Sequence, residues 1–174
     1  MNVSIGDFTV RDARLEDALS IAAYADNPRV AANLRDIFPH PYYLEDAEGF
    51  LRHMMQQEPA TVFAIATAAE AVGIIGLTLG EDVHRFTAEL GYWLGEPFWG
   101  RGVMTAAVRV VVEHGFSEFG LLRIYAEPYV GNAGSARVLE KAGFEYEGRM
   151  RANVFKNGCV LDQLLYSVVR ERAL

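Results

Sequence analysis

The sequence predicts an α+β (α/β) fold, in which a mixed sheet of seven strands is flanked by helices. Apolar residues alternate with a period of two in some segments and recur with helical spacing in others. The predicted order is β-α-α-α-β-β-β-α-β-α-β-β, and three successive strands exclude a doubly wound, all-parallel sheet. With 174 residues the chain can bury a substantial core, so we expect a single domain over residues 1–174.

The N-terminal half is predicted to contain a strand, three helices and a β-hairpin. Pro39 and Pro41 place a loop before the third helix. Two runs rich in β-branched residues, joined by a short polar stretch, predict the hairpin. In order, the segments are 8–14 (strand), 15–27, 28–34 and 44–58 (helices), and 61–67 and 71–80 (hairpin).

The C-terminal half is predicted to contain four strands and two helices. A helix of about 16 residues begins at Val103 by its apolar spacing, and Gly143 ends a shorter helix over 132–144. The strands are 85–95, 121–130, 144–155 and 160–172, the last two joined by a turn at 156–158. The apolar face of the strand over 85–95 is formed by Phe86, Ala88, Leu90, Tyr92 and Leu94.

The composition indicates a soluble cytoplasmic protein. Hydrophobic residues make up 51% of the chain and charged residues 22%, and we find neither a membrane span nor a secretory signal. The single cysteine, Cys159, excludes an internal disulfide framework. A net charge of −7 argues against a nucleic-acid partner, and the histidines lack the spacing of metal ligands. We therefore expect no nucleic acid, no membrane and no metal.

The stretch PFWGRGVMTAA (97–107) lies between a strand and a helix. Unpaired N–H groups and the helix dipole make a helix N-terminus suited to phosphate. Gly100 and Gly102 would let the backbone wrap an anion, and Arg101 adds positive charge. Because Val103 follows Gly102, the stretch is not a P-loop, and it lacks the third glycine of a dinucleotide fingerprint. A plain tight turn is the alternative.

Two stretches, ELGYWLGEPFWGRGVMTAA and NAGSARVLEKAGF, resemble the GNAT superfamily of acetyl-CoA-dependent N-acyltransferases. The likeness is greatest to the RimJ/RimL branch of ribosomal-protein N-terminal acetyltransferases. In the loop pattern Gln/Arg-x-x-Gly-x-Gly/Ala, Trp99 takes the first position, Gly102 the first glycine and Met104 the last. The segments FPHPYYLEDAEGF and GFEYEGRMRANVFKNGCVLDQLLYSV resemble the acceptor-side segment and the C-terminal strand pair of that branch.

This resemblance implies an acetyl-CoA-dependent N-acetyltransferase with a mostly antiparallel sheet, splayed between the strands over 85–95 and 121–130. The acceptor would be a peptide N-terminus or another amine, and the protein a monomer or homodimer. The residues implied in binding acetyl-CoA are Tyr92, Trp93, Leu94, Trp99, Gly100, Arg101, Gly102, Val103, Met104, Thr105, Asn132 and Lys141. Phe38 and Tyr42 are implied on the acceptor side.

Two residues are candidates for proton transfer. Glu89 lies on the strand face opposite the apolar set, where partial desolvation would suit a general base; a structural ion pair is the alternative reading. Many GNAT members carry a tyrosine as the proton donor for the thiolate where this chain has Leu139. Ser135 is then the nearest candidate acid, as in the resembled branch, and it and Asn132 also suit a helix cap.

A non-catalytic GNAT-fold module that binds CoA or regulates another protein is the second function class. Leu139 in place of the tyrosine and Met104 in the loop both favour it. A release assay for free thiol over a panel of amines would distinguish this module from an enzyme.

Overall fold

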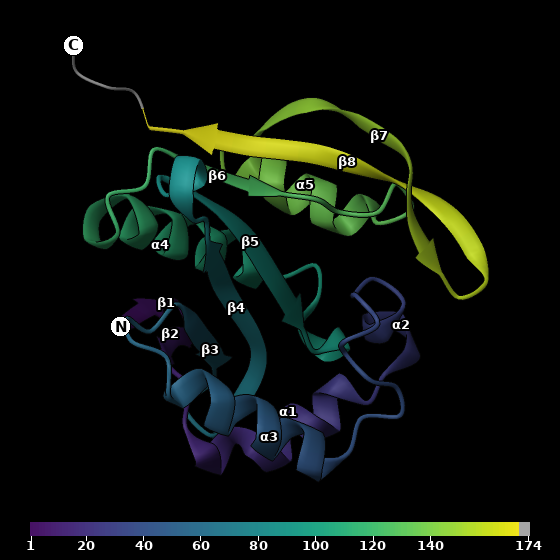
Figure 1. The fold of residues 1–174 in the computed structure, drawn as a ribbon. Coiled ribbons are helices and arrows are strands. Elements are labelled where there is room, and N and C mark those ends of the chain that lie inside the picture. Colours follow the sequence, from purple (N-terminus) through teal and green to yellow (C-terminus); the bar gives the residue numbers. More distant parts are fainter. Residues whose placement is uncertain (171–174) are drawn as a thin grey trace. The chain divides into compact units, whose positions relative to one another are not determined.

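A computed structural model describes residues 1–170 of the chain (Figure 1). The described strands are β1 (Asn2–Ile5), β2 (Phe8–Asp12), β3 (Val62–Ala66), β4 (Ala71–Leu79), β5 (Thr87–Leu94), β6 (Arg123–Ala126), β7 (Glu145–Lys156) and β8 (Cys159–Val169). The helices are α1 (Ala18–Ala25), α2 (Pro28–Ala31), α3 (Leu44–Met55), α4 (Val103–Glu118) and α5 (Ala133–Lys141). Short 3₁₀ turns are η1 (Leu15–Asp17), η2 (Asp82–His84) and η3 (Glu96–Phe98).

The sheet has eight described strands in the order β1-β2-β3-β4-β5-β6-β8-β7. The pairs β1–β2, β2–β3, β3–β4, β6–β8 and β7–β8 are antiparallel, whereas β5 and β6 are parallel. This confirms the predicted mixed, mostly antiparallel sheet with helices. The parallel pairing of β5 with β6 covers only Thr87–Glu89 against Arg123–Tyr125, although β5 continues to Leu94.

The strand that the sequence analysis missed is β1, so the sheet has one strand more than the seven predicted. It pairs with β2 through a two-residue turn, because Ile5 is in register with Phe8. Gly6 in this turn has φ of 72°, a left-handed conformation that glycine adopts without strain. The dipeptide Gly6–Asp7 between two apolar stretches is a hairpin signal that could have revealed the strand.

By its contacts the chain divides into two compact units. The first unit comprises Met1–Gly76 and Tyr92–Ala107, and the second comprises Leu77–Gly91 and the described residues from Val108 onwards. In the first unit α1 and α3 lie side by side (Figure 1), and Ile21 and Leu51, both fully buried, lie in the core cluster to which both helices contribute.

In the second unit the core forms around α4 and β6. Gly115 of α4 allows close packing, since a Cβ there would lie 2.9 Å from a methyl group of Leu77 and 3.0 Å from one of Ile124. The hairpin of β7 and β8 turns at Asn157 and Gly158, whose φ angles are 50° and 77°. These left-handed residues belong to the predicted turn at 156–158.

Several boundaries differ from the prediction. The helix predicted over 15–27 is the 3₁₀ turn η1 followed by α1. Phe86, predicted on the apolar face of the strand over 85–95, lies just before β5 and is 44% exposed. Its carbonyl accepts the N–H groups of Leu122 and Arg123. The strand predicted over 160–172 ends at Val169, and its last two residues, 171–172, lie outside the described residues. Each described helix is too short or too polar to cross a membrane.

Candidate functional site

The end of β5 is held closely against β4 in the first unit. The N–H of Gly95 donates to the carbonyl of Val72 at 2.8 Å. A Cβ at Gly73 would lie 2.5 Å from the carbonyl oxygen of Trp93, so that only glycine allows this approach. The predicted stretch Tyr92–Leu94 therefore has a fixed backbone.

The chain then turns through η3 into the predicted glycine loop. The indole Nε1 of Trp99 donates to the carbonyl of Leu94 at 2.6 Å, which ties the loop back to the end of the strand. Gly100 and Gly102 have φ of 74° and 79°, and a Cβ at either position would meet no atom within 4 Å. The glycines are thus required by the backbone conformation, and the space beside them is open.

The start of α4 follows a glycine, which has no side chain of its own to cap the helix. The N–H of Ala106 donates to the carbonyl of Gly102 at 3.1 Å, which makes Gly102 the N-cap residue. The N–H groups of Val103, Met104 and Thr105 precede this first helical bond, so the helix itself provides no acceptor for them. The side chains of Val103 and Met104 are buried, so Met104 can contribute only its backbone to a ligand.

Arg101 supplies a positive charge beside these N–H groups. Its side chain is exposed, and its guanidinium lies 5.6 Å from the centre of the Phe98 ring. A helix start with glycine at its N-cap position, a second left-handed glycine and a cation together form an arrangement suited to a phosphate group.

The residues predicted on the acceptor side come together with β5. The ring centre of Phe38 lies 4.7 Å from that of Tyr42 and 5.9 Å from that of Trp93. Tyr42 is 6% exposed, and burial, with a smaller contribution from Asp46, raises its pKa to about 12. Tyr42 therefore keeps its proton over the physiological pH range. Tyr42 belongs to the hydrophobic core of this unit, and Phe38 and Trp93 are partly buried and pack against that core.

The predicted base lies in the second unit. Glu89 is half-buried and is in register with Tyr125 of β6, at the last position where the two strands pair. Residues in register on neighbouring strands present their side chains on the same face of the sheet. The structure therefore places the side chains of Glu89 and Tyr125 on the same face of the sheet.

The start of α5 is capped. Asn132 Oδ1 accepts the backbone N–H of Ser135 at 3.0 Å, so the structure brings these two predicted residues together. Lys141 lies at the other end of the helix, about 13 Å away by the helical rise. Its side chain is exposed, and its carbonyl accepts a hydrogen bond from Arg109. Leu139 is fully buried and belongs to the core.

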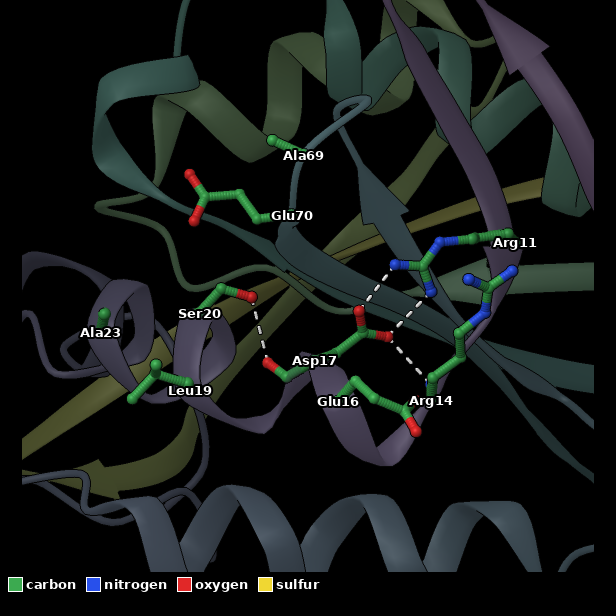
Figure 2. A pocket seen from close by; sticks show the side chains of 9 residues that line it. All are labelled: Arg11, Arg14, Glu16, Asp17, Leu19, Ser20, Ala23, Ala69 and Glu70. Carbon is green, nitrogen blue, oxygen red and sulfur yellow. Dashed lines mark hydrogen bonds and ion pairs between the residues drawn. The ribbon is translucent and has the colours of Figure 1, made fainter.

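A charged pocket in the first unit was not predicted. It has a volume of about 510 Å³, and Figure 2 shows Arg11 and Arg14 together on one side and Glu70 on the other. Asp17, which is 6% exposed, accepts two hydrogen bonds from Arg11 at 2.8 and 2.6 Å and one from the N–H of Arg14 at 2.9 Å. Burial would raise the pKa of Asp17, but these hydrogen bonds outweigh it and hold that pKa below its usual value.

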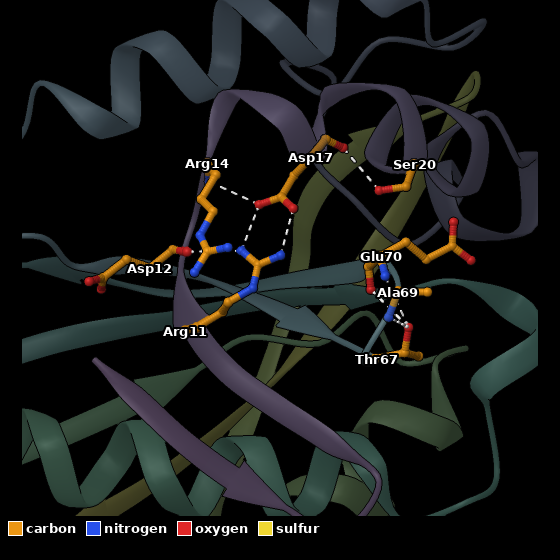
Figure 3. Close-up of polar contacts among 8 residues, drawn as sticks. All are labelled: Arg11, Asp12, Arg14, Asp17, Ser20, Thr67, Ala69 and Glu70. Atoms are coloured by element: carbon orange, nitrogen blue, oxygen red, sulfur yellow. Dashed lines mark hydrogen bonds and ion pairs between the residues drawn. The ribbon is translucent and has the colours of Figure 1, made fainter.

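The other wall of this pocket is also held by internal bonds. Thr67 Oγ1 accepts the N–H groups of Ala69 and Glu70 at 3.2 and 3.1 Å (Figure 3). The hydroxyl of Tyr24 donates to Glu70 Oε1 at 2.7 Å, and this bond raises the pKa of Tyr24. Because Asp17 and Glu70 already have partners, we interpret the pocket as structural. No local sequence pattern indicates these pairings.

Comparison with known proteins provides an independent view of the chain. Residues 7–145 match the family model of the acetyltransferase (GNAT) domain. The chain is 47% identical over 109 residues to the probable N-acetyltransferase YjcK of Bacillus subtilis (strain 168), covering 62% of this chain and 60% of that protein. It is 31% identical over 112 residues to the ribosomal-protein-serine acetyltransferase of Escherichia coli (strain K12), covering 64% and 62%.

The fold is similar to that of solved acetyltransferases. RimL, a ribosomal alpha-N-protein acetyltransferase solved in complex with coenzyme A, superimposes with a TM-score of 0.86 at 19% identity, covering 97% of this chain and 98% of that one. The first three curated relatives are matched over 53% to 60% of their own length. The GNAT fold expected from the resemblance is confirmed.

Proposed function

Because the chain belongs to the acetyltransferase (GNAT) family, we propose that it transfers an acetyl group from acetyl-CoA to an amine. The observation that carries this proposal is the start of α4, where Gly102, which has no side chain, is the N-cap residue and Arg101 precedes it. Its N–H groups suit the pyrophosphate of CoA. The backbone of Tyr92–Leu94 would hold the pantetheine arm, and of its carbonyls that of Leu94 is already engaged by Trp99.

We further propose distinct roles for two residues of the second unit. Acyl transfer requires that the attacking amine lose a proton and that the thiolate gain one. Glu89 would accept the proton of the amine, directly or through a water molecule. Ser135 would donate its hydroxyl proton to the departing thiolate, a role that does not involve the N–H used in the cap.

For the acceptor we propose a peptide N-terminus first, and a small amine second. The ribosomal-protein-serine acetyltransferase among the relatives supports the peptide. A net charge of −7 also favours cationic acceptors through long-range attraction.

The decisive experiment is a thiol-release assay with acetyl-CoA over a panel of N-terminal peptides and small amines. We expect release with at least one acceptor, and a drop in kcat/KM of about 100-fold in Glu89→Gln with unchanged acetyl-CoA affinity. A Glu89→Gln variant with a lower Tm and an unchanged rate would assign the residue a structural role. Tight CoA binding without thiol release on any amine would favour the non-catalytic module.

A further inference from the structure

The segment between β5 and α4 is fastened to α2 by a group of four side chains, Asn27, Arg29, Glu96 and Trp99, which we call the Glu96 clamp. We propose that Asn27, Arg29 and Glu96 are positioning residues that hold the glycine loop ready for the phosphates of CoA. This inference rests on the proposed function, because it takes the start of α4 as the phosphate site.

Glu96 is the centre of the clamp. Its Oε2 accepts a hydrogen bond from Asn27 Nδ2 at 2.8 Å, and its Oε1 forms an ion pair with Arg29. Asn27 is itself fixed, because its Oδ1 caps α2 by accepting the N–H of Arg29 at 2.8 Å. Glu96 is thus held by two donors from a helix start that is 67 or more positions away in sequence.

Trp99 transmits this restraint to the loop. The guanidinium carbon of Arg29 lies 5.4 Å from the centre of the indole ring, while the indole N–H binds the carbonyl of Leu94. The ring is therefore held on one face and at its nitrogen. Gly100, the first left-handed residue of the loop, follows immediately.

A second restraint acts on the neighbouring ring. Phe98 packs edge-on against Phe8 and Tyr24, with ring centres 5.8 and 5.4 Å apart. This packing supports the same turn from β2 and α1. A substitution of one polar clamp residue removes the contacts of the Glu96 clamp and leaves this aromatic packing in place.

The physical effect of the clamp is preorganisation. Two glycines within three residues give the free loop many conformations, and binding would have to select one of them. Fixing the residue before Gly100 removes part of that entropic cost, so ligand affinity rises without any new ligand contact. A direct phosphate contact by Arg29 is the competing explanation, and its pairing with Glu96 speaks against it.

The test compares Glu96→Ala with Glu48→Ala by calorimetric titration of the purified protein with CoA and with dephospho-CoA. Glu48 pairs with Arg52 at 2.9 Å on α3 of the same unit, so its variant removes a comparable exposed ion pair away from the loop. We expect Glu96→Ala to raise the Kd of both ligands equally, by about 10-fold, and Glu48→Ala to leave both unchanged. Glu96→Gln keeps an acceptor for Asn27 and should show a smaller loss.

Fluorescence reports whether the clamp restrains the loop itself, and the CoA titrations report whether that restraint matters for binding. The chain has two tryptophans, so a Trp93→Phe background, used for this measurement only, isolates Trp99. In that background, Glu96→Ala should make Trp99 more accessible to acrylamide quenching. If Glu96→Ala fails to fold, Glu96→Gln carries both measurements.

Three results would overturn the inference or its premise. If Glu96→Ala binds CoA with unchanged affinity while Gly102→Asn loses affinity, the proposed role of the Glu96 clamp is wrong and the proposed phosphate site stands. A loss for CoA but not for dephospho-CoA means that Arg29 contacts the 3′-phosphate directly. Unchanged affinity in Gly102→Asn contradicts the proposed phosphate site itself.

Discussion

The starts of α4 and α5 differ in the side chain that their N-cap residues offer to the first N–H groups of the helix. Each helix begins with N–H groups that have no partner within the helix. At α5, Asn132 supplies a side-chain acceptor for the N–H of Ser135. At α4, the N-cap residue is Gly102, which has no side chain to offer. At α5 the protein thus supplies an acceptor for one N–H group, whereas at α4 we propose that a ligand supplies the acceptors.

The comparison therefore separates groups that serve stability from groups that serve binding. Changes at the start of α4 should alter ligand affinity and leave stability nearly unchanged. Changes at the start of α5 should alter stability or rate. Each prediction below tests this separation, beginning with the largest expected effect.

The largest effect is expected when α4 is given the cap that α5 has. Asparagine tolerates left-handed φ better than most residues and brings an acceptor to the helix N–H groups, so Gly102→Asn should occupy them. We expect the Kd for acetyl-CoA to rise about 100-fold, as for the loss of two hydrogen bonds to a charged group. Gly6→Asn, at φ of 72° and also in open space, is the matched control and should bind normally. Calorimetry decides between the two outcomes.

A smaller effect is expected at Ser135. Ser135→Ala removes the hydroxyl but keeps the backbone N–H that the cap uses, so the helix cap should be retained. If the hydroxyl protonates the thiolate, kcat should fall about 10-fold, which is less than the roughly 100-fold or more typical of general acid catalysis, because a thiolate is already a fair leaving group. An unchanged kcat, with chemistry limiting the rate, would remove Ser135 from the mechanism.

The cap itself should contribute a modest stability. Asn132→Ala is expected to lower the free energy of unfolding by about 1 kcal/mol, measured by urea denaturation. Asn132→Ser retains an oxygen acceptor and should recover most of the loss. Equal losses in both variants would show that capping is not the cause.

The smallest effect is expected for the stability contributed by Glu147, a hydrogen-bonded carboxylate in the second unit. Hydrogen bonds from Arg123 and then Ser167 lower the pKa of Glu147 from 4.5 to about 2. Because the folded pKa is depressed, this stabilisation is fully present above pH 4.5 and is lost as the pH falls toward 2. Glu147 is 35% exposed, so solvent screening limits its contribution at neutral pH to about 1 kcal/mol or less.

The measurement for this last prediction is unfolding of Glu147→Gln over the same pH range. The difference from the parent protein should shrink on acidification and vanish near pH 2. A difference that persists at low pH would mean that packing around Arg123, rather than charge, supplies the stability.

Local features of the fold could be predicted from the sequence. The apolar spacing predicted α4 with its start at Val103. Gly143, with φ of 96°, directly follows Ala142, the C-cap residue of α5, as a helix-ending glycine. Such features depend on residues close together in the chain. The β1 hairpin was also local, and it was missed because only its turn residues, Gly6 and Asp7, distinguish it.

The long-range parts of the candidate site could not be predicted. Asn27 binds Glu96 across 69 positions, and nothing in either residue's neighbourhood specifies the other. The bidentate pair of Arg11 and Asp17 lies only six positions apart but was also not predicted, because the packing of the chain decides which of the neighbouring charged residues pair. The roles of Glu89 and Ser135 stay predictions, because proton transfer is a property of a reaction and not of a contact.

Gly102 and Gly73 disfavour a side chain for different reasons: the left-handed backbone conformation at Gly102 and the lack of space at Gly73. At Gly102 a side chain has room, but an L-residue is strained at φ of 79°. A D-alanine placed there by chemical ligation would be relaxed, because a positive φ is the ordinary conformation of its mirror image. At Gly73 the L-side chain fails for lack of space beside the carbonyl of Trp93. Replacement of Gly102 by D-alanine therefore distinguishes two effects of a substitution in the loop. It adds a methyl group beside the bound phosphate without adding backbone strain.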